Sequence, residues 1–146
     1  MALATTAVGK TWEPVSFEIE AARIVQYADA VGEASPIHRD PEAARAAGYR
    51  DVVAPPMFVV VYSAPALAPA LLDPEVGMNF AAMVHGSQEF TWAEPVCAGD
   101  VISTQVRCES ISERGGMGFY VFESVSTNQD GAETARGVWT NIVRGV

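Results

Sequence analysis

The sequence predicts an α+β domain in which an antiparallel sheet curls around a central, very apolar helix. Two observations carry this prediction. Residues 57–72 form the most apolar run of the chain and have the length of a helix. The second half then changes to alternating apolar and polar residues separated by glycine turns, which is typical of paired strands. With 146 residues the chain has the size of one domain, and we expect residues 1–146 to fold as a single unit.

The N-terminal part begins with a predicted strand and a predicted helix. Residues 11–17 are rich in aromatic and β-type residues, but Pro14 interrupts them, so they form an edge strand or an extended lead-in. In residues 18–31 apolar side chains recur every three or four positions, which predicts an amphipathic helix that ends near Gly32. A loop, residues 33–39, follows.

A short helix and then the apolar helix are predicted next. Asp40 fits an N-cap with Pro41 at the first helical position, and a glycine ends this helix after about two turns. Pro56 fits the first turn of the apolar helix, which Pro65 and Pro69 kink or end. Because this helix is apolar on nearly every face, we expect the rest of the protein to wrap it on nearly every side.

The second half is predicted to form an antiparallel meander. In residues 101–111 apolar residues alternate with polar ones, so one face of that strand contacts water. Such a sheet leaves an edge strand exposed, and pairing of two edges across a twofold axis protects it. We therefore expect a homodimer or a heterodimer with a similar chain. The predicted strands are residues 79–92, 101–111, 118–126 and 135–144, with hairpin turns at Gly115-Gly116 and Asp130-Gly131.

Composition excludes several classes of function. The chain has 18 acidic and 9 basic residues and a net charge of −9, so we expect no nucleic-acid partner. Residues 57–72 are shorter than the roughly 20 apolar residues that span a bilayer, so no membrane partner is expected. The N-terminus lacks a signal-peptide pattern and Cys97 and Cys108 form no CxxC pair, which predicts a cytoplasmic protein with reduced thiols.

No cofactor or metal site is predicted. The sequence contains no P-loop, no dinucleotide fingerprint and no G-x-S-x-G elbow. Its two histidines lack the HxxxH spacing of a helical metal site. We therefore expect neither a metal nor a nicotinamide or nucleotide cofactor.

Three segments of the chain resemble the MaoC-like family of enoyl-thioester hydratases and dehydratases. Residues 27–38, YADAVGEASPIH, resemble the hydratase signature, in which a helix ends in Gly-Asp, followed by Asn-Pro, an aliphatic residue and His. Residues 47–58 resemble the entry to the family's central helix, and residues 88–100 resemble its later strand and turn. The resemblance covers nearly the whole chain, fits best the branch akin to fungal-type fatty acid synthase dehydratase domains, and implies a hot-dog fold.

The resemblance implies reversible addition of water to a 2-enoyl thioester, which gives an (R)-3-hydroxyacyl thioester carried on coenzyme A or acyl carrier protein. In this chemistry a carboxylate and a histidine hold one water, and hydrogen-bond donors stabilise the enolate oxygen. The matching positions are Glu33 and His38. Histidine suits the task because its ordinary pKa lies near neutral pH, so that it both accepts and returns a proton.

The chain departs from the family pattern at three places. Glu33 replaces the usual aspartate and is longer by about 1.5 Å, and a misplacement of about 1 Å can cost on the order of a hundredfold in rate. Ser35 replaces the usual asparagine, and we group it with the substrate-binding residues. Pro55-Pro56 replaces a His-Gly pair whose glycine amide binds the carbonyl, and proline has no amide hydrogen. The amide of Met57 is then the predicted substitute donor.

Other polar residues have weaker assignments. His85, in a predicted strand, is a secondary candidate for the substrate pocket. A structural role stays the alternative for His85, for His38 as a locally hydrogen-bonded loop residue, and for Glu33 as a surface acid. Tyr62 and Ser63 lie on the apolar helix, where we expect them to pack or to satisfy backbone carbonyls.

Three functions stay open. The leading one is a lyase in which His38 acts as base and acid with Glu33 as its partner. The second is a non-catalytic acyl-binding subunit whose partner carries the catalytic pair, and the missing aspartate and glycine favour it. A hot-dog thioesterase ranks below both, because residues 57–72 contain no acid that would activate water.

Overall fold

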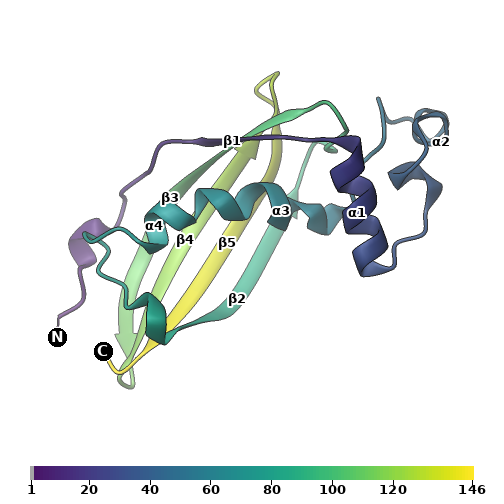
Figure 1. The fold of residues 1–146 in the computed structure, drawn as a ribbon. Helices are drawn as coiled ribbons and strands as arrows, with labels where there is room; N and C mark the ends of the chain where they lie inside the picture. Colours follow the sequence, from purple (N-terminus) through teal and green to yellow (C-terminus); the bar gives the residue numbers. More distant parts are fainter. Residues whose placement is uncertain (1) are drawn as a thin grey trace.

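A computed structural model of the chain describes residues 2–146. Its main feature is a five-stranded antiparallel sheet, in the order β1-β3-β4-β5-β2, which curls around one helical segment (Figure 1). The α+β architecture predicted from the sequence is therefore confirmed. The strands are β1 (Val15–Glu18), β2 (Met83–Trp92), β3 (Val101–Arg114), β4 (Met117–Thr127) and β5 (Glu133–Arg144).

The meander of β3, β4 and β5 follows the predicted turns. Gly115 and Gly116 connect β3 to β4 and both have positive φ angles, 58° and 75°, which glycine adopts without strain. The predicted alternation in β3 is also confirmed, because Ile102, Thr104, Val106 and Cys108 are buried against the helical side while their neighbours are not. Among the strands of residues 2–146, β2 pairs only with β5, so β2 and β1 are the two edges of the sheet.

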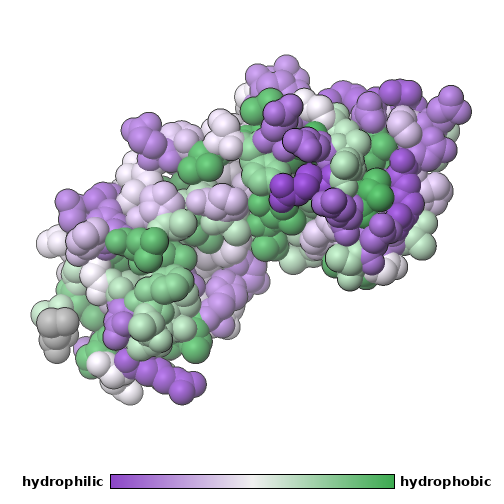
Figure 2. Space-filling view, viewed as in Figure 1, coloured by the Kyte–Doolittle hydropathy of each residue, from purple (hydrophilic) through white to green (hydrophobic). Residues whose placement is uncertain are grey.

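The central helical segment is broken, as its prolines predict. It consists of a 3-10 turn (Pro56–Phe58), α3 (Val59–Ser63), a second 3-10 turn (Ala64–Ala66) and α4 (Ala68–Leu71). The breaks fall at Pro65 and Pro69, which lack the amide hydrogen that continues a helix. The expectation that the segment is wrapped on nearly every side is wrong for the single chain, since Met57 is 45% exposed and Pro65 and Pro69 are exposed. Figure 2 shows apolar surface over α3 in the middle of the molecule.

Two helices lie at one end of the sheet (Figure 1). α1 (Ala21–Val31) ends at Gly32, which has the predicted left-handed conformation. It begins three residues later than its apolar period predicts, because Glu18 still belongs to β1. α2 (Pro41–Ala46) begins as predicted, with the Asp40 carboxylate accepting a hydrogen bond from the Glu42 amide. The remaining 3-10 turns are Thr5–Ala7, Pro36–His38 and Phe80–Ala82.

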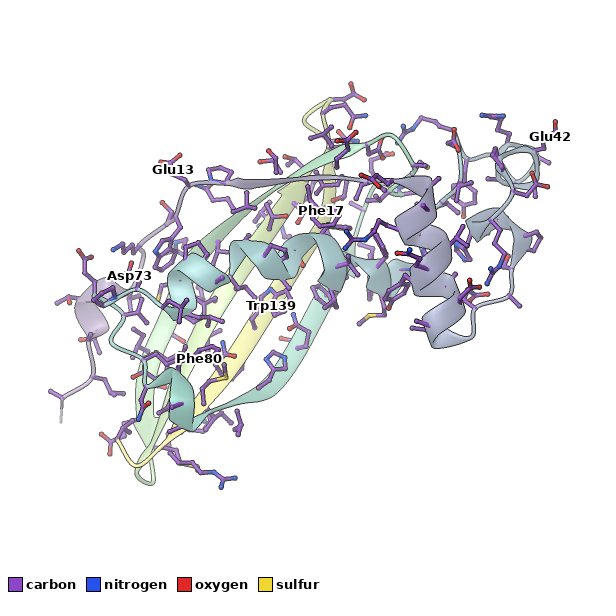
Figure 3. The ribbon with its side chains drawn as sticks, in the orientation of Figure 1. Glu13, Phe17, Glu42, Asp73, Phe80 and Trp139 are labelled. Atoms are coloured by element: carbon purple, nitrogen blue, oxygen red, sulfur yellow. The ribbon has the colours of Figure 1, made fainter. Side chains whose placement is uncertain are left out.

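The hydrophobic core lies between the helical segment and the sheet. One cluster packs α4 against Phe122 and Trp139, and Figure 3 shows Trp139 between the sheet and the helix. A second cluster packs Phe58 and Tyr62 against Ile102. Within residues 2–146 no helix is long and apolar enough to cross a membrane.

The N-terminal segment is fastened to the end of the central helix by one carboxylate. Asp73 accepts a hydrogen bond from the Trp12 indole at 2.8 Å and pairs with the Lys10 ammonium at 2.7 Å. The Lys10 ammonium also binds Glu75 at 2.6 Å. The hydrogen bond from Lys10 is the main reason why the pKa of Asp73 lies below its ordinary value. Figure 3 shows Asp73 beside the N-terminal segment.

A second carboxylate, Asp100, is completely buried and binds four donors. The Arg50 guanidinium donates to both of its oxygens at 2.9 Å, and the Cys97 amide and the Gln129 side-chain amide each donate at 2.9 Å. Burial alone would raise the pKa of Asp100, but these hydrogen bonds outweigh it and hold the pKa below its ordinary value. We call the four residues Arg50, Cys97, Asp100 and Gln129 the Asp100 clamp. It ties together three loops that are distant in sequence.

Replacing Asp73 with asparagine is expected to lower the melting temperature at pH 7 by a few degrees. The folded-state pKa of Asp73 is lowered, so its stabilising contribution is present above the unfolded-state pKa of about 3.9 and is lost as the pH falls through the folded-state value. Melting curves of both proteins between pH 7 and pH 2 check this. A difference that stays constant down to the lowest pH would contradict the assignment.

Replacing Asp100 with asparagine is expected to lower the free energy of unfolding by about 2 kcal/mol, because charge-assisted hydrogen bonds to a buried carboxylate are lost. Urea denaturation measures the change. Glu109→Gln is the matched control, since Glu109 and its partner Arg107 are each 48% exposed and such pairs contribute little. Equal losses in the two variants would show that the clamp is no stronger than a surface pair.

Candidate functional site

A cavity of about 490 Å³ lies at the start of the central helical segment. Its walls come from the loop before α2, the segment that enters the helix, α3, the end of β2 and the turn after it. They are mainly apolar, and a cavity of this size and character suits a small organic group. The lining side chains include Ile37, His38, Tyr49, Val53, Tyr62, Trp92, Val96 and Thr134.

His38 lies in the wall of this cavity and is only 6% exposed. Its Nδ1 is 2.6 Å from the carbonyl oxygen of Val53. A carbonyl only accepts hydrogen bonds, so Nδ1 carries the hydrogen and the Nε2 atom of the neutral ring has a free lone pair. This geometry is that of a histidine held ready to accept a proton at Nε2.

The Val53 carbonyl is itself held by backbone pairing that leads to the Asp100 clamp. The Val53 amide donates to the Ile37 carbonyl at 3.1 Å, and the Ala54 amide donates to Val96 at 2.8 Å. Val53 forms a β-bridge with Cys97, whose amide donates to the Asp100 carboxylate. The orientation of the His38 ring therefore depends on a carboxylate outside the cavity.

Glu33 and Ser35 lie in the same loop as His38 but not in the cavity wall. The Glu33 carboxylate accepts a hydrogen bond from the Ser35 amide at 2.9 Å. The Glu33 carbonyl accepts from the Arg39 guanidinium at 2.7 Å, and Arg39 also pairs with Asp29. Among the described residues Glu33 makes no hydrogen bond to His38, so their sharing of a water stays a prediction.

The entry to the central helix offers few free donors. Pro55 and Pro56 lack amide hydrogens, and the Phe58 amide donates to the Pro55 carbonyl at 2.9 Å. The Trp92 indole donates to the Pro56 carbonyl at 2.8 Å. Over the part of the chain that the structure describes, the Met57 amide has no acceptor, but Met57 does not line the cavity. Its role as the carbonyl donor stays a prediction.

His85 lies on β2, outside the cavity wall. Its Nδ1 is 3.4 Å from the Asn141 side-chain oxygen, and its ring packs edge-on against Trp139 with 6.1 Å between centroids. This is the environment of a structural strand histidine. A direct role of His85 at the substrate stays a prediction.

Sequence reasoning missed Tyr62 as a site residue. Ser63 behaves as expected, since its hydroxyl donates to the Val59 carbonyl at 2.5 Å. Tyr62 instead turns into the cavity with 2% of its surface exposed. Burial raises the pKa of Tyr62, and the neighbouring Thr134 side chain only partly offsets this. The signal in the sequence that could have indicated Tyr62 is its position as a single phenol directly after three valines, residues 59–61.

The described residues contain no group of three or more His, Cys, Asp or Glu side chains arranged to hold a metal ion. The chemistry that this site supports is acid–base chemistry: a buried imidazole with a free Nε2, a buried phenol and apolar walls. The two cysteines, Cys97 and Cys108, are both free and buried.

Comparisons with known proteins agree with this fold. The family model described as "FAS1-like, dehydratase domain region" matches residues 6–136. A UPF0336 protein of Saccharopolyspora erythraea is 37% identical over 146 residues, which are 99% of this chain and 94% of that protein. A UPF0336 protein of Clavibacter michiganensis is 40% identical over 123 residues, 84% of this chain and 83% of that protein.

Solved structures show the same fold. The truncated HadBC (3R-hydroxyacyl-ACP dehydratase) complex of Mycobacterium tuberculosis matches with a TM-score of 0.79 and 30% identity, over 96% of this chain and 99% of that chain. A MaoC-like dehydratase matches with a TM-score of 0.84 and 22% identity, over 96% of this chain and 43% of that one. The predicted hot-dog fold is confirmed, and the chain belongs to the FAS1-like dehydratase domain family together with the UPF0336 proteins.

Proposed function

We propose that this protein catalyses the reversible hydration of 2-enoyl thioesters to (R)-3-hydroxyacyl thioesters. A general hydratase or dehydratase role follows from the family and the fold. The observation that carries the specific proposal is His38, which is buried in an apolar cavity with Nδ1 committed to the Val53 carbonyl and Nε2 free.

His38 performs both proton transfers. In hydration, Nε2 removes a proton from water while the water oxygen bonds to C3 of the enoyl group, and the C2=C3 electrons move toward the thioester carbonyl. The resulting imidazolium then returns the proton to C2. In dehydration the same steps run in reverse. The Val53 carbonyl accepts from Nδ1–H throughout and keeps the ring oriented. No redox step occurs, so the reaction needs no cofactor.

Glu33 is the proposed carboxylate of the pair. It lies five residues before His38, and its hydrogen bond to the Ser35 amide holds it at the loop beside the cavity. Orienting the attacking water is the task that we assign to it, with Ser35 as the residue that positions its carboxylate. Removal of the Glu33 charge should therefore affect the rate less than removal of His38.

A structural neighbour and the exposed sheet edge support the proposals for the substrate carrier and the partner. The HadBC complex acts, by its name, on a 3R-hydroxyacyl group on acyl carrier protein. We propose that this chain likewise acts on an acyl group carried by acyl carrier protein or coenzyme A.

The outer side of β2 is unpaired, and Met57, Val84 and Trp92 near it are 43 to 48% exposed. We propose that a second hot-dog chain, identical or related, covers this edge, and that the protein acts in the cytoplasm.

A second function is favoured by one specific observation. The Glu33 carboxylate is absent from the cavity wall and is committed to the Ser35 amide. If this arrangement persists when substrate binds, the chain is a non-catalytic acyl-binding subunit and its partner supplies the catalytic pair.

Purified protein should consume the enoyl absorbance of crotonyl-CoA and longer 2-enoyl-CoA substrates. His38→Ala is expected to lower kcat by about 10² to 10⁴-fold, the usual contribution of a general acid–base group. The kcat of Glu33→Gln should lie between that of His38→Ala and that of the unchanged protein. His85→Ala, which removes the other histidine of the chain, should change the rate only a few-fold, because His85 lies outside the cavity.

Three results of this assay would change the assignment. Activity that survives in His38→Ala would overturn the mechanism. Inactivity of a folded protein that still binds acyl thioesters would establish the acyl-binding subunit. Release of free coenzyme A thiol would instead indicate a thioesterase, because a hydratase leaves the thioester intact.

A further inference from the structure

The hydration reaction needs a hydrogen-bond donor for the thioester carbonyl, and most donors around the cavity are already committed. The amides of Val53 and Ala54 donate to Ile37 and Val96. Those of Ala93 and Glu94 donate to Thr134 and Glu133, at 2.9 and 3.0 Å. None of these four amides can turn toward a ligand without breaking backbone pairing.

The entry to the central helix is equally poor in free donors. Pro55 and Pro56, which both line the cavity, have no amide hydrogen. The Trp92 indole is committed to the Pro56 carbonyl. The first amide of the helix that could replace them belongs to Met57, which does not line the cavity.

Tyr62 presents a buried phenol to the same cavity from α3. Its ring is packed against Phe58, with 6.3 Å between centroids, and Phe58 is packed in turn against Tyr27 at 5.5 Å. The ring position is therefore set by core packing. The polar group beside the phenol is Thr134, whose hydroxyl donates to the Ser126 carbonyl at 3.3 Å.

Physical chemistry favours a charged acceptor at this phenol. A hydrogen bond to an anionic oxygen is roughly twice as strong as one between neutral groups, so an enolate oxygen competes well against the Thr134 hydroxyl. Burial keeps the phenol protonated, because it raises the pKa of Tyr62. A donor that is buried and held by its ring has little to reorganise when negative charge develops.

We infer that Tyr62 is a catalytic residue whose hydroxyl donates a hydrogen bond to the carbonyl oxygen of the substrate thioester. It takes the place of the backbone amide hydrogen that is missing at Pro55-Pro56. The inference rests on the proposed hydratase function and names a further residue of that site. Tyr62 keeps its proton throughout. Negative charge develops on the carbonyl oxygen as water adds to C3 and His38 takes one proton. This negative charge is lost when C2 is protonated.

The test uses a conjugated thioester, 2,4-hexadienoyl-CoA, whose absorbance maximum moves to longer wavelength when its carbonyl is polarised. His38→Ala serves as the background, so that the ligand is not consumed. Spectra of the bound ligand are compared for His38→Ala, His38→Ala with Tyr62→Phe, and His38→Ala with Tyr27→Phe. Tyr27→Phe is the matched control, because it removes a phenol from the same aromatic group but does not line the cavity.

We expect a red shift in the background protein and the Tyr27→Phe control that is largely lost with Tyr62→Phe. In the protein with His38 intact, Tyr62→Phe should lower kcat by about 10² to 10³-fold, the usual effect of removing one such donor. Saturation is followed by tryptophan fluorescence, since Trp92 lines the cavity. If Tyr62→Phe does not fold, Tyr62→Met, which fills similar space without a hydroxyl, replaces it.

The outcomes separate the inference from the function on which it rests. An equal red shift with and without the Tyr62 hydroxyl overturns the inference and leaves the hydratase proposal intact. A saturated ligand with no shift in the background protein also overturns it. No saturable binding to any variant overturns the proposed function, and the inference with it.

Discussion

The buried carboxylate of Asp100 is the interaction on which the site depends. Three residues donate four hydrogen bonds to it, and among them only Arg50, which donates two, carries a charge. A carboxylate with no exposed surface is costly unless its oxygens are satisfied, and here each oxygen receives two hydrogen bonds. Cys97, which is held by Asp100, forms a β-bridge with Val53 and so fixes the position of Val53. The Val53 carbonyl in turn sets the tautomer of His38. Within residues 2–146, His38 is the only histidine of the cavity wall, and Asp100 orients it without contacting it.

The prolines of the central segment act as the second constraint. Pro55 and Pro56 remove amide hydrogens where the helix begins, and Pro65 and Pro69 break it into short pieces. In the inferred mechanism a side chain therefore binds the carbonyl, and Tyr62 is a buried phenol in the cavity wall. The start of the segment stays exposed at Met57, and the preceding Pro56 carbonyl accepts a hydrogen bond from Trp92 on the edge strand β2. An apolar face next to an open sheet edge is what a second subunit of the same fold covers.

Much of the fold was predictable because its signals are local. Gly32 ends α1, Asp40 caps α2, and glycines form the hairpin turns at residues 115–116 and 130–131. In each case a few neighbouring residues determine the backbone geometry. The start of α1 was predicted three residues early. Residues 18 and 19 lie inside the range predicted as helix, yet Glu18 pairs with Val101 and the Ile19 amide donates to the Asp100 carbonyl. Pairing with a distant segment overrode the local pattern.

The sequence by itself determined the fold class, because this depends on periodicity and turn residues. The resemblance of its segments to known proteins indicated the family and placed His38 in a short motif. Only the tertiary structure decided which atom of His38 is free, since its partner Val53 is 15 residues away. It also decided that Glu33 binds the Ser35 amide and that Tyr62 faces the cavity. Side-chain partners of this kind depend on how distant segments pack, and a single sequence carries no local signal for that packing.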